Sequence, residues 1–191
     1  MPMNGKKIIA ARHLCPLLIA IFAIVIVPTA KGIDVSNDRA GAAERSFKSE
    51  MAGGWHFVRT PNPNGGPDAI SIMHTADTSK SDLDLAGLMI RCREGSPDVV
   101  IVLLRAFPLR ARPRVSLGRL ESETRFEATV AAPGTAILLP GDAATLVNGS
   151  WRDQKDIFIR VDEGQTTIRG VVTLAGLQGA FKVLVASCPG Q

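Results

Sequence analysis

Five arginines stand close together in the middle of the chain: Arg105, Arg110, Arg112, Arg114 and Arg119, with Pro108 and Pro113 among them. Guanidinium groups form bidentate contacts with phosphates and carboxylates, so this cluster predicts a surface for an anionic partner. The other interpretation is an exposed connection that charge and proline keep soluble and extended. Three carboxylates follow closely and could neutralise the arginines across a hairpin, namely Glu121, Glu123 and Glu127.

The other chemically reactive residues form no recognisable catalytic or metal-binding motif. His56 and His74 do not have the spacing that places two ligands on one helix face, and the chain lacks a nucleophile elbow, a P-loop and a dinucleotide fingerprint. Asp82 and Asp84 suggest acid–base or calcium chemistry, but the surrounding segment lacks the further oxygen ligands of a calcium loop, which favours a solvated turn. We therefore predict no catalytic residue, no metal site and no cofactor.

The start of the chain has the pattern of an export signal. Lys6, Lys7 and Arg12 precede an apolar run over residues 14–27, and the small residue Ala30 marks a cleavage site. The apolar run is shorter than the roughly 20 residues that cross a bilayer, which favours a cleaved signal peptide over residues 1–30. Because Pro28 stands where the peptidase prefers a small residue, an uncleaved anchor remains the alternative. The expected location is periplasmic or secreted.

Removing this leader changes the charge of the protein. The whole chain carries 22 basic and 18 acidic residues, and losing three leader cations leaves 19 basic against 18 acidic. The exported part is therefore nearly neutral. Its composition, which includes no tyrosine and few aromatic residues, argues against a nucleic-acid partner.

Removing the leader also changes the cysteine count. Cys15 leaves with it, and Cys92 and Cys188 remain in a compartment where thiols oxidise, which predicts one disulfide between them. Two buried free thiols are the alternative. Cys92 shares a strand face with Leu88 and Ile90, so its side chain is expected to point into the core.

The elements that would position these residues are mostly short strands. Alternating or continuous apolar patterns between Gly and Pro signals predict strands over residues 55–59, 69–75, 88–92, 99–104, 114–117, 125–130, 136–139, 157–161 and 166–174. A weak helix is expected over residues 142–148, with Asp142 as its N-cap. A clearer helix ends the chain, because Leu177, Phe181, Leu184 and Cys188 have helical spacing.

These elements predict a mainly β fold, either an antiparallel β-sandwich or a curled sheet, with a C-terminal helix. Residues 31–54 are polar and lack a sustained apolar period, so they are expected to be a linker, and residues 55–191 form the β-rich domain. Trp151 is expected in the core.

The ends of this domain resemble a known family. Trp55 stands near the start of the domain, and a strand with Leu88, Arg91 and Cys92 follows it. The end of the domain has Leu174, Gly176, Leu177, Ala180, Leu184 and Cys188. This arrangement is similar to that of the small exported bacterial proteins grouped as type VI secretion-associated VasI/TagO-like. The resemblance implies a periplasmic accessory role and supplies no catalytic residues.

The expected function is that of a non-enzymatic envelope protein, a binding or accessory module. Its partner would be an envelope or secretion-associated protein or an anionic envelope component, and it would meet a membrane only through an uncleaved leader. The alternative is a small periplasmic hydrolase or small-ligand-binding protein whose pocket the sequence does not reveal.

Overall fold

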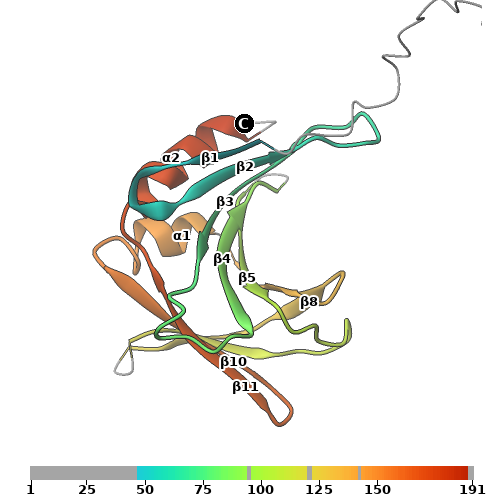
Figure 1. The fold of residues 1–191 in the computed structure, drawn as a ribbon, viewed down its shortest axis with the longest axis vertical. Helices are drawn as coiled ribbons and strands as arrows, with labels where there is room; N and C mark the ends of the chain where they lie inside the picture. The colour runs from blue at the N-terminus through green and yellow to red at the C-terminus, as the bar shows by residue number, and fades with distance from the viewer. Residues whose placement is uncertain (1–46, 94–95, 120–121, 142, 189–191) are drawn as a thin grey trace, which may run out of the picture. The chain divides into compact units, whose positions relative to one another are not determined.

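The structure is a computed structural model that describes residues 47–93, 96–119, 122–141 and 143–188. The expected signal peptide, most of the expected linker and the expected N-cap Asp142 lie outside these residues. The prediction of a mainly β fold with a C-terminal helix is confirmed, since the described strands form two antiparallel sheets (Figure 1).

The larger sheet has seven strands. In spatial order they are β1 (Phe47–Glu50), β2 (His56–Thr60), β3 (Ala69–Thr75), β4 (Leu85–Arg91), β5 (Asp98–Leu103), β9 (Ala136–Leu138) and β8 (Thr129–Ala131). The smaller sheet has four strands in the order β11 (Thr166–Thr173), β10 (Asp156–Glu163), β6 (Arg114–Gly118) and β7 (Thr124–Glu127). The described helices are the 3-10 helix η1 (Ala52–Gly54), α1 (Ala143–Asn148) and α2 (Leu177–Ser187).

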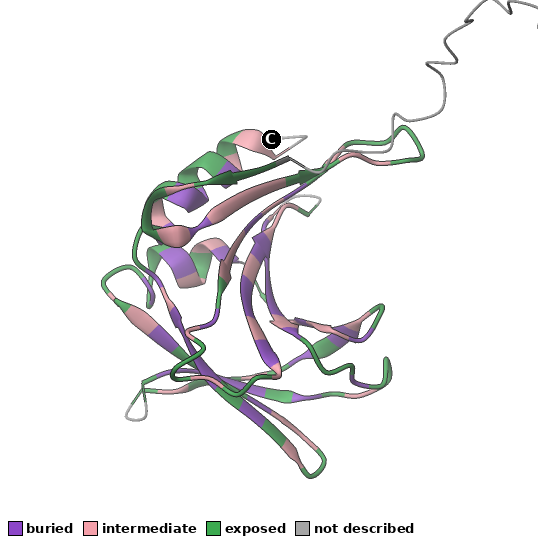
Figure 2. Ribbon diagram, in the orientation of Figure 1, coloured by how far each residue is buried: buried purple, intermediate pink, exposed green. Residues whose placement is uncertain are grey.

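One hydrophobic core joins both sheets and the helices. β3, β4, β10 and β11 alternate, with one face in the core, whereas β5 is buried at almost every position. The core contains Ile72, Leu88 and Ile101 of the large sheet, and α2 adds Leu184. Figure 2 shows this alternation as purple bands along the strands. Trp151 is 3% exposed, as predicted.

The predicted strand over residues 125–130 is in fact two strands. β7 ends at Glu127 in the small sheet and β8 begins at Thr129 in the large sheet, with the fully buried Ala128 between them. The Ala128 N–H donates to the Pro113 carbonyl 2.9 Å away, which extends the register of β7 with β6 by one residue pair before the chain leaves the small sheet. The chain therefore passes directly from the edge of one sheet to the edge of the other.

The prediction of a linker over residues 31–54 is wrong for its last residues. Phe47–Glu50 forms the edge strand β1, which pairs with β2 from Phe47 opposite Arg59 to Glu50 opposite His56. The segment has no apolar period because Lys48, Ser49 and Glu50 are all exposed. Short, polar edge strands of this kind avoid pairing with a strand of another molecule.

The free edge of β11 is covered by residues 77–82. The Asp77 and Asp82 N–H groups donate to carbonyls of β11, and in return the Arg169 N–H donates to Asp82 Oδ2 at 2.7 Å and the Val171 N–H to Ser81 Oγ at 2.9 Å. The loop thus completes the hydrogen bonds of an edge that would otherwise be open. It also brings Lys80 to the outer face of the small sheet.

Candidate functional site

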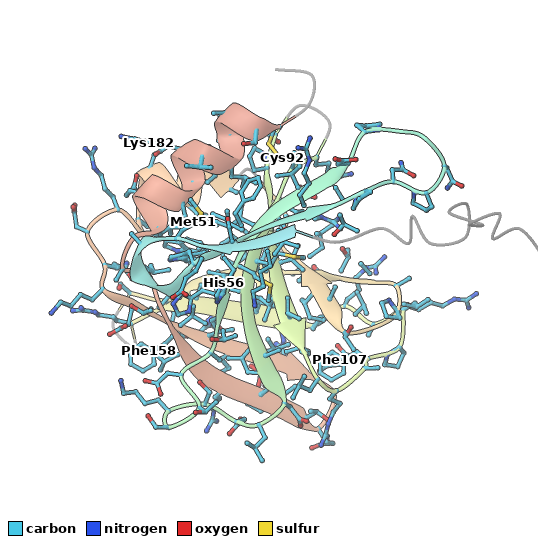
Figure 3. The ribbon with its side chains drawn as sticks, turned by 45° about the horizontal axis from the view of Figure 1, so that its top comes forward. Met51, His56, Cys92, Phe107, Phe158 and Lys182 are labelled. Carbon is cyan, nitrogen blue, oxygen red and sulfur yellow. A yellow bond between two sulfur atoms is a disulfide. The ribbon has the colours of Figure 1, made fainter. Side chains whose placement is uncertain are left out.

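Cys92 and Cys188 form the predicted disulfide, with a sulfur–sulfur distance of 2.05 Å and a sequence separation of 96. Cys92 follows β4, and Cys188 caps the C-terminus of α2. Figure 3 shows the sulfur–sulfur bond beside α2. Both cysteines are half-buried and pack against the core, so the bridge ties the last helix to a central strand.

The five predicted arginines do not form a single patch. Arg105, Arg110 and Arg112 are exposed on the connection between β5 and β6. Arg114 lies on β6 with Glu127 of β7 on one side and Asp162 of β10 on the other. Arg119 follows the opposite end of β6, about 17 Å further along at the usual rise of a strand. The cluster thus divides into a loop group and two separate positions.

The two carboxylates of the expected solvated turn have defined partners. Asp84 Oδ2 lies 3.0 Å from Arg105 Nε, and Asp82 binds the edge of β11. Both therefore hold the loops in place. The predicted turn is present, with Asp82 exposed and Asp84 partly exposed, and its two carboxylates have the structural partners just described.

A row of arginines that the sequence reasoning missed crosses the outer face of the small sheet. Arg169 of β11 is opposite Arg160 of β10, which is opposite Ser116 of β6, which is opposite Arg125 of β7. These four residues, named here the arginine row, point away from the core because the neighbouring positions of each strand point into it. Each strand contributes a single member, so only the sheet register reveals the row.

A depression of about 490 Å³ lies along three members of this row, Ser116, Arg160 and Arg169. Its lining includes Lys80, Ser116, Glu123, Phe158, Arg160 and Arg169. The hollow forms because β6 places only Ser116 and Gly118 between the large side chains of the flanking strands. Phe158 is 48% exposed at one end of it, and Figure 3 shows this ring on the side of the molecule away from Lys182 of α2. The depression combines three cations, one carboxylate and an exposed ring.

The cations of this surface are not equivalent. Arg160 Nε lies 2.8 Å from Asp162 Oδ2, and Lys80 Nζ lies 2.9 Å from Asp77 Oδ2. Burial acts to raise the pKa of Asp162, but hydrogen bonds from Thr167 and Arg160 outweigh it and hold that pKa below its usual value. Among the described residues, no carboxylate forms an ion pair with the side chain of Arg169, which is the cation most available to a ligand.

The two histidines of the domain have different surroundings. The His74 ring nitrogens lie 2.7 Å from the Thr75 carbonyl and 2.9 Å from the Gly53 carbonyl, and its ring contacts Trp55 edge to face. His56 stands on β2 between Glu50 and Met73. Neither lines the depression. His74 therefore ties β3 to η1 through backbone contacts.

Comparison with protein-family models, with curated proteins and with solved structures finds no match for this chain. The family resemblance of the two domain ends thus stays a prediction. Within the described residues, no group of three or more histidine, cysteine or carboxylate side chains could hold a metal ion. None of the helices in that part of the chain has the length and apolarity to span a membrane.

Proposed function

We propose that this chain is an exported, non-enzymatic binding module that holds an acidic segment of an envelope protein on the outer face of its small sheet. The arginine row beside Phe158 is the observation that carries the proposal. The disulfide supports the exported location, because such a bridge persists in oxidising compartments such as the periplasm. An accessory role next to a secretion system would be one form of this function.

The dimensions of the arginine row favour a peptide over a small anion. Neighbouring strands are about 4.8 Å apart, so the span from Arg169 to Arg125 is about 14 Å. A single phosphate would meet one of these guanidinium groups, whereas spaced carboxylates of an acidic segment would meet several. Phe158 would pack against an apolar side chain of the same segment, as aromatic residues do in interface centres.

The surroundings of the histidines support binding over hydrolysis. A general base needs a free ring nitrogen within hydrogen-bond reach of a substrate. Both His74 nitrogens already face backbone carbonyls, and the depression is lined by neither histidine. The alternative of a small-ligand protein would use the same depression. The two are distinguished by whether the affinity for an acidic peptide increases with the length of the peptide.

The test is the affinity of the domain for a fluorescent octa-glutamate peptide, measured by anisotropy. We expect Arg169→Gln to weaken binding about fivefold, the effect of losing about 1 kcal/mol from one charged contact at a surface. Phe158→Ala is expected to weaken binding of a peptide that also contains leucine more than binding of octa-glutamate itself.

Lys182→Gln is the matched control, since Lys182 is an exposed cation on α2, away from the depression (Figure 3). It should change the affinity less than twofold. Equal losses in Arg169→Gln and Lys182→Gln would show a nonspecific charge effect and contradict the site. Equal affinity for di-glutamate and octa-glutamate would favour the small-ligand alternative.

A further inference from the structure

Exposed leucines gather on two adjoining loops at one edge of the domain. The large apolar side chains most exposed among the described residues include Leu83 at 83%, Leu104 at 69% and Leu109 at 55%. The loops adjoin because the Leu104 N–H donates to the Asp84 carbonyl at 2.8 Å. These leucines, with Arg105, Arg110 and Arg112 of the second loop, are named here the leucine tip.

The leucine tip is held in place from beneath. Phe107 is buried between the two exposed leucines of its loop, and its N–H donates to the Gly134 carbonyl at 2.9 Å. Pro113 is buried where the loop enters β6, and the Ala111 N–H closes a turn onto the Pro108 carbonyl. The leucines therefore protrude from an anchored loop, in which the single aromatic ring points inward and the aliphatic side chains point outward.

A small hollow of about 270 Å³ separates the two loops of the tip. Leu83 and Leu104 form its rim, and Leu85 and Ala86 of β4 are among the residues that line it. Leu83 of the first loop and Leu104 of the second thus line the same hollow. Soluble domains expose apolar patches of this kind chiefly where they meet a partner or a membrane.

The charge of the tip is positive. Asp84 pairs with Arg105, and Asp82 is occupied by the backbone of β11. Arg110 and Arg112 form no ion pair with any carboxylate of the described residues, and Arg112 donates only to the neighbouring Ala111 carbonyl. The leucines are thus accompanied by two guanidinium groups that are free to bind anions.

We propose that the leucine tip docks on the surface of a membrane that contains anionic lipids. The leucines would enter the region between head groups and acyl chains, while Arg110 and Arg112 would bind lipid phosphates, since long cationic side chains extend towards the interface. The protruding leucines match the apolar acyl chains of the membrane, and the unpaired arginines beside them match its anionic head groups. This contact is separate from the arginine row and from any contact through the leader.

The test is co-sedimentation with vesicles of phosphatidylcholine, with and without phosphatidylglycerol. The protein used begins at Lys31, so that the apolar leader is absent, and the buried core of the described residues, which starts at Trp55, is retained. We expect binding to the vesicles with phosphatidylglycerol, little binding to phosphatidylcholine alone, and weaker binding as salt is raised. Absence of binding to phosphatidylglycerol vesicles at low salt would overturn the proposal.

Two double variants separate the apolar and the charged contributions. Arg110→Gln with Arg112→Gln should lower the vesicle partition coefficient about 25-fold, from about fivefold for each cation near an anionic surface. Leu104→Ser with Leu109→Ser should lower it roughly tenfold or more, and it should do so at high salt as well.

Val183→Ser and Lys182→Gln are the matched controls, because they remove an exposed apolar side chain and an exposed cation from α2. They should leave vesicle binding unchanged, as should Arg169→Gln of the arginine row. Equal losses in tip and control variants would refute docking through the tip. Binding of the tip to octa-glutamate without binding to vesicles would instead identify a protein partner.

All variants change exposed side chains, and their thermal midpoints should match that of the parent protein.

Discussion

At the scale of single residues, Asp77 shows how a partly exposed surface carboxylate acquires a structural role. Its Oδ1 accepts hydrogen bonds from the Ser79 hydroxyl at 2.6 Å and the Ser79 N–H at 3.0 Å, and Lys80 lies beside its other oxygen. The Ser79 hydroxyl, Lys80 and the Ser79 N–H lower the pKa of Asp77 from 3.8 to about 2. The turn that covers β11 therefore depends on a charged Asp77.

This depressed pKa predicts a pH dependence of stability. A carboxylate whose pKa is lower in the folded protein stabilises the fold above its unfolded pKa, and that contribution is lost as pH falls. We expect Asp77→Asn to reduce the slope of unfolding free energy against pH between 3.8 and about 2, measured by urea titration. Asp153→Asn, at an exposed aspartate in the turn after α1, is the control. Identical slopes for both variants would contradict the role of Asp77.

At the scale of elements, the start of α2 and the helix η1 meet by direct backbone contact. Gly176 precedes α2 with a φ of 78°, and a Cβ there would collide with the Ala52 carbonyl oxygen. A Cβ on Gly53 would likewise collide with the Ala175 carbonyl oxygen, to which Trp55 Nε1 donates at 3.1 Å. Two glycines therefore allow the first and the last helix of the domain to touch.

Two glycine substitutions at α2 should have opposite effects. Gly176→Ala is expected to lower the free energy of unfolding by about 1 to 3 kcal/mol, because the added carbon meets backbone and the φ is unfavourable for alanine. Gly179→Ala, two residues into α2, meets no atom within 4 Å and should raise it by about 0.5 to 1 kcal/mol. Chemical denaturation of both variants measures the difference, and equal effects would show that the close backbone contact is unimportant.

Strands with a buried face were predictable from sequence, and the exceptions have a common physical cause. β3, β4, β10 and β11 alternate because one face packs in the core. β1 buries no apolar face in its exposed positions 48–50, so no period marks it. The break at Ala128 was hidden because a strand that changes sheets keeps its extended backbone, and only the identity of its neighbours changes.

At the scale of the whole molecule, the disulfide and α2 bind distant parts of the chain into one core. The bridge crosses 96 residues, and α2 packs against β3 and η1. In the chain-entropy model a loop of this length stabilises the folded state by roughly 4 to 5 kcal/mol relative to the open chain. The bridge therefore adds to the stability of the folded domain.

Removing the bridge should lower stability without changing the fold. We expect Cys92→Ser with Cys188→Ser to reduce the free energy of unfolding by about 2 to 5 kcal/mol, measured by guanidinium titration. Non-reducing peptide mass spectrometry of the parent should show one peptide pair linked through Cys92 and Cys188. A parent protein with two alkylatable thiols, or a double variant of unchanged stability, would contradict the role assigned to the bridge.

The candidate sites also show what the sequence could reveal. Arg110 and Arg112 were recognised because they are near each other in the chain, and the structure exposes both. The arginine row was missed because Arg125, Arg160 and Arg169 become neighbours only through the strand register. The leucine tip was missed because leucines such as Leu83 and Leu104 are usually buried in the core. In the second loop Phe107 is the residue that packs into the core, and Leu104 stays exposed.

The contact between η1 and α2 joins the beginning and the end of the folded domain. Trp55, Gly53 and Cys92 come early in the folded chain, yet each meets a group from the last helix or the residues just before it. Folds dominated by such long-range contacts form slowly, because a large loop must close before the contact is gained. The contacts that join these early residues to α2 can therefore form only after α2 has been synthesised. A domain whose closing contacts form last would be well suited to a route that carries proteins across a membrane before they fold.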